Sequence, residues 1–131
     1  MKVLTIKQPW ATLLARGIKT DETRSWSTSF RGEFLIHAAK EWDWDSMHIY
    51  WAIKKKFNLP DPDEIPTGKI IGKAELTAVM TSEDYKLTNH YIGQEQFGNY
   101  EPNRFVFLCQ NHVELPTYIP ATGKQKFWEH E

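Results

Sequence analysis

The chain has 131 residues, with 16 basic and 17 acidic side chains and a formal net charge of −1. This near-neutral balance argues against a histone-like or polybasic nucleic-acid binder, and a single cysteine excludes an internal disulfide. The composition, 40% hydrophobic and 25% charged, is typical of a globular protein with one core. With neither a signal peptide nor a membrane-length apolar run, we expect one cytoplasmic domain over residues 1–131 and no membrane partner.

The charges are unevenly placed along the chain. Residues 1–40 contain seven Lys and Arg side chains against three acids, whereas the other 91 residues contain nine against fourteen. This asymmetry predicts a basic face on a neutral molecule. The alternative, charges scattered over an ordinary solvated surface, stays open at this point.

The first third of the chain predicts a strand, a short helix and a second strand. Residues 2–6 alternate polar and apolar side chains, as in a half-buried strand. Pro9 is tolerated in the first turn of a helix, which we expect to reach about Arg16, and Gly17 supplies the left-handed residue that commonly ends one. A strand over about 20–26 follows.

The middle of the chain predicts a central strand, a helix and a long strand. Residues 33–39 are apolar enough for a strand buried on both faces. A helix from Asp43 or Asp45 to about Phe57 comes next, and its tryptophans, Trp42, Trp44 and Trp51, are expected in the core. Residues 69–80 alternate as a strand, and Thr81 with Asp84 resembles a capping pair that opens a short helix.

The last third predicts a loop, a pair of strands and a tail. Residues 93–103 are rich in glycine and polar side chains, which favours a loop. Strands over 104–109 and 113–119 are expected to flank a turn at 110–112, followed by a short tail with Phe127 and Trp128. Together these elements indicate an α+β fold, in which five or six strands form a mixed or antiparallel sheet that curls into a small barrel with two or three flanking helices.

Short motifs along nearly the whole chain resemble the ASCH domain family, a branch of the PUA-like barrels, and within it the coactivator-type branch. The resemblance rests on their order and spacing: Gln8-Pro9-Trp10-Ala11, Gly17-Ile18-Lys19, Glu22, Arg24-Ser25-Trp26, Arg31-Gly32, Ile36-His37-Ala38, Gly68, Gly72, Phe105-Val106-Phe107, Asn111, Pro120, Gly123 and Trp128. It implies a PUA-like barrel with a role in binding RNA, DNA or a nucleoside in a cleft beside residues 17–24. In the amidohydrolase branch of the family a Lys is followed three residues later by Thr and then by Arg; Lys19 and Arg24 match, but Glu22 replaces the Thr.

Four residues form the strongest candidate site. Glu22, Arg24 and Trp26 alternate along one predicted strand and should share a face, with Lys19 close by. Lys19 and Arg24 could hold phosphate, Trp26 could stack on a base, and Glu22 could accept from a base edge or act as a general base. An ordinary ion pair between Glu22 and Arg24 is the alternative.

Three further residues could extend this site. Arg31 and Lys40 flank the predicted central strand and could form a phosphate-binding rim, while His37 is either a ligand contact or a core histidine. The histidines and the cysteine show no metal-ligand spacing, so we expect neither a metal nor a cofactor.

Three functional hypotheses follow, of which the third is a protein-interaction module that uses the tryptophans around the second predicted helix and requires those rings to be exposed. The leading one is a protein that binds single-stranded RNA or DNA, or a nucleotide, through a basic cleft with an aromatic wall formed by Lys19, Arg24, Trp26, Arg31, His37 and Lys40. The alternative is a small hydrolase acting on RNA or a modified nucleoside, with Lys19 and Glu22 as the catalytic pair and Glu75 or Glu83 as candidates for the distant glutamate of the amidohydrolase branch. The oligomeric state stays open.

Overall fold

A computed structural model of the chain describes residues 1–131 and contains one six-stranded sheet. Its strands are β1 (Lys2–Gln8), β2 (Asp21–Arg24), β3 (Gly32–Trp42), β4 (Lys69–Thr81), β5 (Phe105–Pro120) and β6 (Phe127–Glu129). They lie in the order β2-β5-β4-β3-β1-β6, and only the β1–β3 pair is parallel. The predicted α+β class with a mixed sheet is confirmed.

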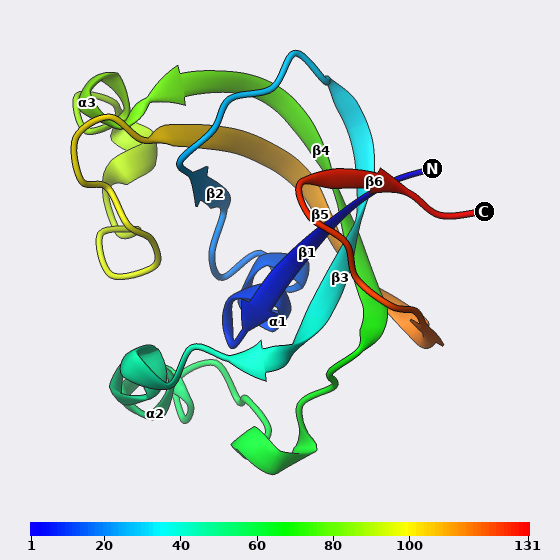
Figure 1. Cartoon of the computed structure of the whole chain (residues 1–131). Helices are drawn as coiled ribbons and strands as arrows, with labels where there is room; N and C mark the ends of the chain where they lie inside the picture. The colour runs from blue at the N-terminus through cyan, green and yellow to red at the C-terminus, as the bar shows by residue number, and fades with distance from the viewer.

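The sheet curls strongly around its own core but does not close by hydrogen bonds (Figure 1). The two edge strands, β2 and β6, have four and three residues and do not pair with each other. Side chains bridge the gap instead: Trp26, just beyond β2, meets Phe127 of β6 edge-to-face with ring centroids 6.0 Å apart. The sequence predicted a fully closed barrel, and this prediction is wrong. The edge strands are short, and aromatic rings rather than hydrogen bonds occupy the seam between them.

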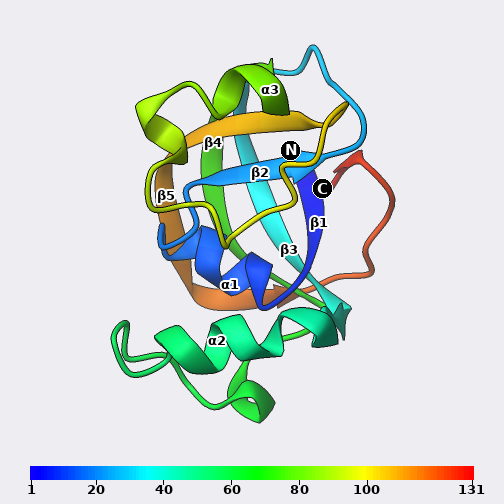
Figure 2. The same cartoon turned by 90° about the vertical axis from the view of Figure 1, so that its left-hand side faces the viewer.

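Three short α-helices accompany the sheet: α1 (Trp10–Ala15), α2 (Met47–Ile53) and α3 (Ser82–Tyr85), with 3₁₀ turns at Trp44–Ser46, Pro62–Glu64 and Asn89–Tyr91. Helix α1 packs against β1, β3, β4 and β5 inside the curve of the sheet, whereas α2 lies outside it (Figure 2). The close approach of α1 depends on Gly72 of β4, since a Cβ added there would lie 2.7 Å from the Ala15 side chain. No helix has the length and apolar character that a bilayer crossing requires.

Two apolar clusters matter for the site. The larger one fills the curl of the sheet beneath α1, with Leu14, Phe34 and Phe107 among its members. The smaller one joins α1, α2 and the 93–103 loop through Leu13, Tyr50 and Phe97. Burial of apolar surface is the main stabilising term in folding. The smaller cluster therefore anchors the 93–103 loop over the turn that joins α1 to β2.

The predicted pair of strands near the end of the chain is instead one long bent strand. Both halves of β5 pair with the single strand β4, so no hairpin turn forms at residues 110–112. The extra residues are absorbed by register shifts and by Asn111 in a left-handed conformation (φ +56). The predicted tail also differs, because Phe127–Glu129 pairs with β1 as β6.

The second predicted helix is shorter than expected, and two of its three tryptophans are not in the core. Trp42, the third, is partly buried against the smaller apolar cluster. Helix α2 ends at Ile53 and buries Tyr50 and Ile53 in the smaller apolar cluster. Trp44 and Trp51 lie outside this buried face and are 68% and 55% exposed. The core prediction is wrong for these two. Trp44 lies in the 3₁₀ turn before α2, and Trp51 lies on the side of this short helix that faces solvent.

Candidate functional site

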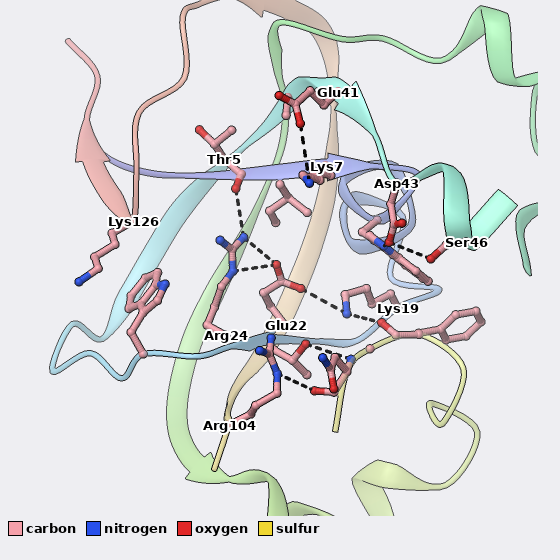
Figure 3. A pocket seen from close by; sticks show the side chains of 18 of the residues that line it. Thr5, Lys7, Lys19, Glu22, Arg24, Glu41, Asp43, Ser46, Arg104 and Lys126 are labelled. Carbon is pink, nitrogen blue, oxygen red and sulfur yellow. Dashed lines mark hydrogen bonds and ion pairs between the residues drawn. The ribbon is translucent and has the colours of Figure 1, made fainter. Parts of the chain in front are cut away.

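The larger of two hollows in the protein is an open cleft of about 920 Å³ beside β1, α1 and β2 (Figure 3). Its walls come from six segments far apart in the sequence, including the 96–99 loop and residues 124–126. Six cationic side chains line it, against three carboxylates: Lys7, Lys19, Arg24, Arg104, Lys124 and Lys126, with Glu22, Glu41 and Asp43. The cleft thus carries an excess of three positive charges on a molecule whose net charge is −1.

Lys19 lies on the floor of the cleft, almost fully enclosed. Gly17 (φ +74) ends α1, and the amides of Ile18 and Lys19 both donate to the carbonyl of Leu13, which turns the chain toward β2. The Lys19 ammonium donates to the Phe97 carbonyl, sits 3.2 Å from Glu22 Oε1, and lies 5.5 Å from the centre of the Trp10 ring. Its side chain is 2% exposed, so its hydrogen-bonding capacity is directed inward.

Glu22 joins Lys19 to Arg24 at the base of the cleft. Its second oxygen, Oε2, accepts from Arg24 Nη2 at 2.8 Å and from Nε at 3.2 Å, and Nη2 also donates to the Thr5 carbonyl. Burial acts to raise the pKa of Glu22, but Lys19 and Arg24 outweigh it and the pKa is lowered. One ionised carboxylate therefore serves two cations, which leaves this group of three with a net positive charge.

Trp26 forms part of the wall on the basic side. Its ring packs edge-to-face on Phe107, with centroids 5.3 Å apart, and Lys126 Nζ lies 5.6 Å from the ring centre. Glu22 and Arg24 lie two residues apart in β2, and Trp26 follows in the segment just after the strand, where its ring packs at the seam of the sheet. The indole is half-buried and keeps a surface toward the cleft.

Asp43 stands at the opposite side of the cleft, beside Ser46 and Glu41 (Figure 3). Its Oδ2 accepts from Trp10 Nε1 at 2.9 Å and from Ser46 Oγ at 2.8 Å. Partial burial acts to raise the pKa of Asp43, but these two hydrogen bonds, with Lys7 and the Asp45 amide, lower it overall. Asp43 is therefore a carboxylate held in its ionised form at neutral pH.

Comparison with known proteins identifies the family. The ASCH domain family model matches residues 4–117. The chain belongs to the ASCH domain family. Activating signal cointegrator 1 from Homo sapiens is 30% identical over 130 residues, which are 96% of this chain and 22% of the relative, and the Mus musculus protein is 29% identical over the same shares. The chain thus spans about a fifth of the length of these relatives.

Solved structures show the same fold. The crystal structure of ASCH from Zymomonas mobilis has a TM-score of 0.57 and 17% identity, covering 91% of this chain and 72% of that one. A mutant form of the same protein has a TM-score of 0.55 and 15% identity, covering 91% of this chain and 74% of that one. At these identities the likeness establishes the fold alone.

Of the residues singled out from the sequence of this ASCH domain, four meet in the cleft and three do not. Lys19, Glu22, Arg24 and Trp26 line it together. Arg31 is exposed and donates to the carbonyls of Thr28 and Phe30 in its own loop. The rim predicted around Arg31 therefore lies outside the cleft, because the guanidinium closes a local turn.

His37 and Lys40 line a second, smaller hollow of about 360 Å³. His37 is buried in β3, and its Nε2 lies 2.7 Å from the Ala121 carbonyl. Burial lowers the pKa of His37, so the ring is neutral at neutral pH and adds no charge for an anion. Its position in the sheet corresponds to the core histidine of the two alternatives that the sequence left open.

The glutamates considered for a hydrolytic role in the ASCH amidohydrolase branch also lie outside the cleft. Glu75 accepts from the side-chain amides of Gln110 and Asn111 on the sheet. Glu83 lies in α3, where it accepts from Ser82. Neither lines the cleft, so Glu22 is the carboxylate that contacts Lys19.

Six other cleft residues of the ASCH domain were not predicted from the sequence: Lys7, Asp43, Ser46, Arg104, Lys124 and Lys126. They come from segments that only the folded chain brings together. One feature of the sequence could have indicated some of them. Lys124 and Lys126 follow Gly123 closely in the predicted tail, and two neighbouring lysines are typical of an anion-binding segment.

Proposed function

We propose that the cleft binds single-stranded RNA or DNA, or a nucleotide derived from either. The observation that carries this proposal is the concentration of six cations and a half-buried indole in one cleft of a molecule with a net charge of −1. Phosphates favour such local positive charge, and bases favour flat aromatic surfaces. Kinship with the coactivator-type ASCH proteins is consistent with a nucleic-acid ligand.

The buried ion pairs position the binding groups rather than contact the ligand. Lys19 is enclosed, with a side chain only 2% exposed, and is held by Phe97 and Glu22, so it does not present its ammonium to a phosphate in the cleft. Glu22 in turn fixes the Nε and Nη2 edge of Arg24. The Nη1 group of Arg24, whose side chain is 21% exposed, donates to no protein acceptor and is available to a phosphate.

The rim supplies the other contacts. Lys124 and Lys126 are exposed and have no carboxylate partner, and Arg104 donates only its Nε, to the Asn99 carbonyl. Lys126 covers Trp26 and can move to a phosphate as a base takes its place on the indole. Stacking on an aromatic side chain contributes about 1 to 3 kcal/mol per base.

Salt-dependent binding tests the proposal. The double variant Lys124→Gln/Lys126→Asn removes two cleft charges, and Asn suits position 126 because its φ is +53. With single-stranded oligonucleotides in fluorescence anisotropy, we expect weaker binding and a plot of log affinity against log salt that is shallower by about 1.4, at roughly 0.7 per lost phosphate contact. The matched control is Lys55→Gln/Lys86→Gln, which removes two exposed charges outside the cleft. An affinity that does not change with salt concentration would contradict the proposal, and so would an equal loss of affinity in the control variant.

A second candidate function is hydrolysis of RNA or of a modified nucleoside by Lys19 and Glu22. The direct contact of these two groups on the floor of the cleft favours it. The lowered pKa of Glu22 and its engagement by two cations make it a weak general base, so the geometry favours binding over catalysis. Incubation with RNA and acylated nucleosides decides between them: product formed by the wild type and lost in Lys19→Ala and Glu22→Ala would establish the hydrolase.

A further inference from the structure

We propose that Asp43 reads the bound base and selects bases that carry an exocyclic amino group. The inference rests on the proposed nucleic-acid function and concerns the end of the cleft opposite its cationic rim. In Figure 3, Asp43, Ser46 and Glu41 lie on one side together with Lys7, which pairs with Glu41. Lys126 and Arg104 lie on the other side, and Arg24, Glu22 and Lys19 lie between them. A nucleotide placed with its phosphate on the cationic side can direct its base toward the acidic side.

Asp43 differs from the other two carboxylates of the cleft because no cation pairs with it. Glu22 is held by Lys19 and Arg24, and Glu41 Oε2 lies 3.7 Å from Lys7 Nζ. No Lys, Arg or His nitrogen lies within ion-pair distance of the Asp43 carboxylate. Its charge is therefore not neutralised by an ion pair, and the nearby Lys7 only favours the ionised form.

The side-chain hydrogen bonds of Asp43 fix its orientation through one of its two oxygens. Both side-chain donors, Trp10 Nε1 and Ser46 Oγ, reach the same oxygen, Oδ2. No side-chain donor reaches Oδ1. The Asp45 amide also donates to this carboxylate, but each carboxylate oxygen has two lone pairs, so acceptor capacity is left for a ligand. The backbone is also held, since the Asp43 amide donates to the Gln8 carbonyl at 2.7 Å. A carboxylate fixed from two elements before the ligand arrives loses little freedom on binding, which favours a reader of base edges.

The chemistry of the base edge gives the specificity. A carboxylate only accepts hydrogen bonds, so it suits the N4 amino group of cytosine or the N6 amino group of adenine. Uracil presents a carbonyl oxygen, O4, where cytosine presents the amine, and two acceptors repel. Cytosine and uracil are thus the smallest contrast that separates selection by Asp43 from contacts shared by all nucleotides.

The experiment compares oligocytidylate with oligouridylate of equal length at neutral pH and constant salt, using the whole chain. We expect the wild type to bind oligocytidylate about 5- to 150-fold more tightly. Asp43→Asn should bring the ratio close to one, because the amide can accept from N4 or donate to O4. Glu41→Gln is the matched control: it removes one carboxylate from the same side of the cleft, and the ratio should stay at the wild-type value.

The outcomes separate this inference from the function on which it rests. Equal binding of both oligomers by the wild type, still weakened by loss of Lys124 and Lys126, overturns the role of Asp43 and leaves nucleic-acid binding intact. No binding of either oligomer overturns the proposed function itself. An equal loss for both oligomers in Asp43→Asn overturns base selection in favour of a structural role. If that variant does not fold, Ser46→Ala keeps the charge, removes one orienting hydrogen bond and should reduce the ratio; an unchanged ratio contradicts the inference.

Discussion

Glu22 is the single residue on which the charge balance at the floor of the cleft depends most. It is the only carboxylate in contact with Lys19 and with Arg24, and it is buried together with the ammonium. Charges removed from water are tolerated only when they are paired and hydrogen-bonded, so the three groups depend on one another. The sequence predicted that these residues share a face, but not that Lys19 is enclosed, because enclosure depends on Phe97, 78 positions along the chain.

Replacing Glu22 by Gln should destabilise the fold strongly. The change leaves the buried Lys19 ammonium without its counter-charge, and breaking a buried pair typically costs about 3 to 5 kcal/mol. Urea unfolding of Glu22→Gln and the wild type measures the difference. Glu33→Gln, which loses an exposed partner of Lys73, should stay within about 0.5 kcal/mol of the wild type, and a similar small effect at Glu22 would contradict the account.

The same carboxylate makes stability depend on acid pH. Burial acts to raise the pKa of Glu22, yet Lys19 and Arg24 bring it below the ordinary value of 4.5, so the folded state binds a proton less readily than the unfolded state. This contribution is fully present above pH 4.5 and is lost as pH falls through the folded pKa. Thermal unfolding between neutral and acid pH should therefore show a steeper decline for the wild type than for Glu22→Gln; parallel curves would contradict the pairing.

At the scale of elements, the site depends on how the 93–103 loop is tied to the turn between α1 and β2. Gln94 makes both ties: its Oε1 accepts from the Thr20 amide and its Nε2 donates to the Ile18 carbonyl. Asn99 adds a third, from its amide to the Thr23 hydroxyl. The loop thereby brings the Phe97 carbonyl onto Lys19 and encloses the floor of the cleft.

Gln94→Ala should loosen this loop. It leaves the Thr20 amide and the Ile18 carbonyl without their partners, and unpaired groups in such positions cost about 1 to 3 kcal/mol. Hydrogen exchange is the measurement: the Thr20 amide should exchange faster in the variant. Gln96→Ala is the control, since this glutamine is exposed in the same loop and makes neither contact. Unchanged protection of Thr20 in Gln94→Ala would show that the loop is held by its apolar anchor alone.

The elements predicted best were those with strong local signals. The alternation of residues 2–6 and 69–80 located β1 and β4, the apolar run at 33–39 located β3, and Gly17 located the end of α1. The composition of Gln110-Asn111-His112 predicts a turn, but both halves of β5 pair with β4, which keeps them in one strand. Strand β6 was missed for a related reason: three residues carry little pattern of their own, and their partner is β1.

Across the whole molecule, basic side chains are concentrated in the cleft although the net charge is close to zero. Six of the sixteen Lys and Arg side chains line one cleft with three of the seventeen acids. The basic character predicted for residues 1–40 contributes only Lys7, Lys19 and Arg24, and the other three cations come from beyond residue 100. Lys19, Glu22, Arg24 and Trp26 could be predicted as neighbours because they lie close together in the sequence. The contributions of residues 96–104 and 124–126 could not be predicted, because only the fold brings these segments to the cleft.

The molecule also exposes two tryptophans outside the cleft, Trp44 and Trp51, which lie just before α2 and within it. Neither of them lines the cleft. A ligand that stacks on tryptophan could bind at either place, so the six tryptophans offer a direct comparison between them.

The measurement that tests the central claim is a titration of the isotopically labelled protein with a single-stranded oligonucleotide, followed through the six indole N–H signals in NMR spectra and assigned by single Trp→Phe variants. Binding in the cleft should shift the signals of Trp26 and Trp10 the most, together with the Nε–H signals of Arg24 and Arg104, and leave Trp44 and Trp51 nearly unchanged. Shifts confined to Trp44 and Trp51, or a spectrum that does not respond to any oligonucleotide, would contradict the assignment of this cleft as the binding site.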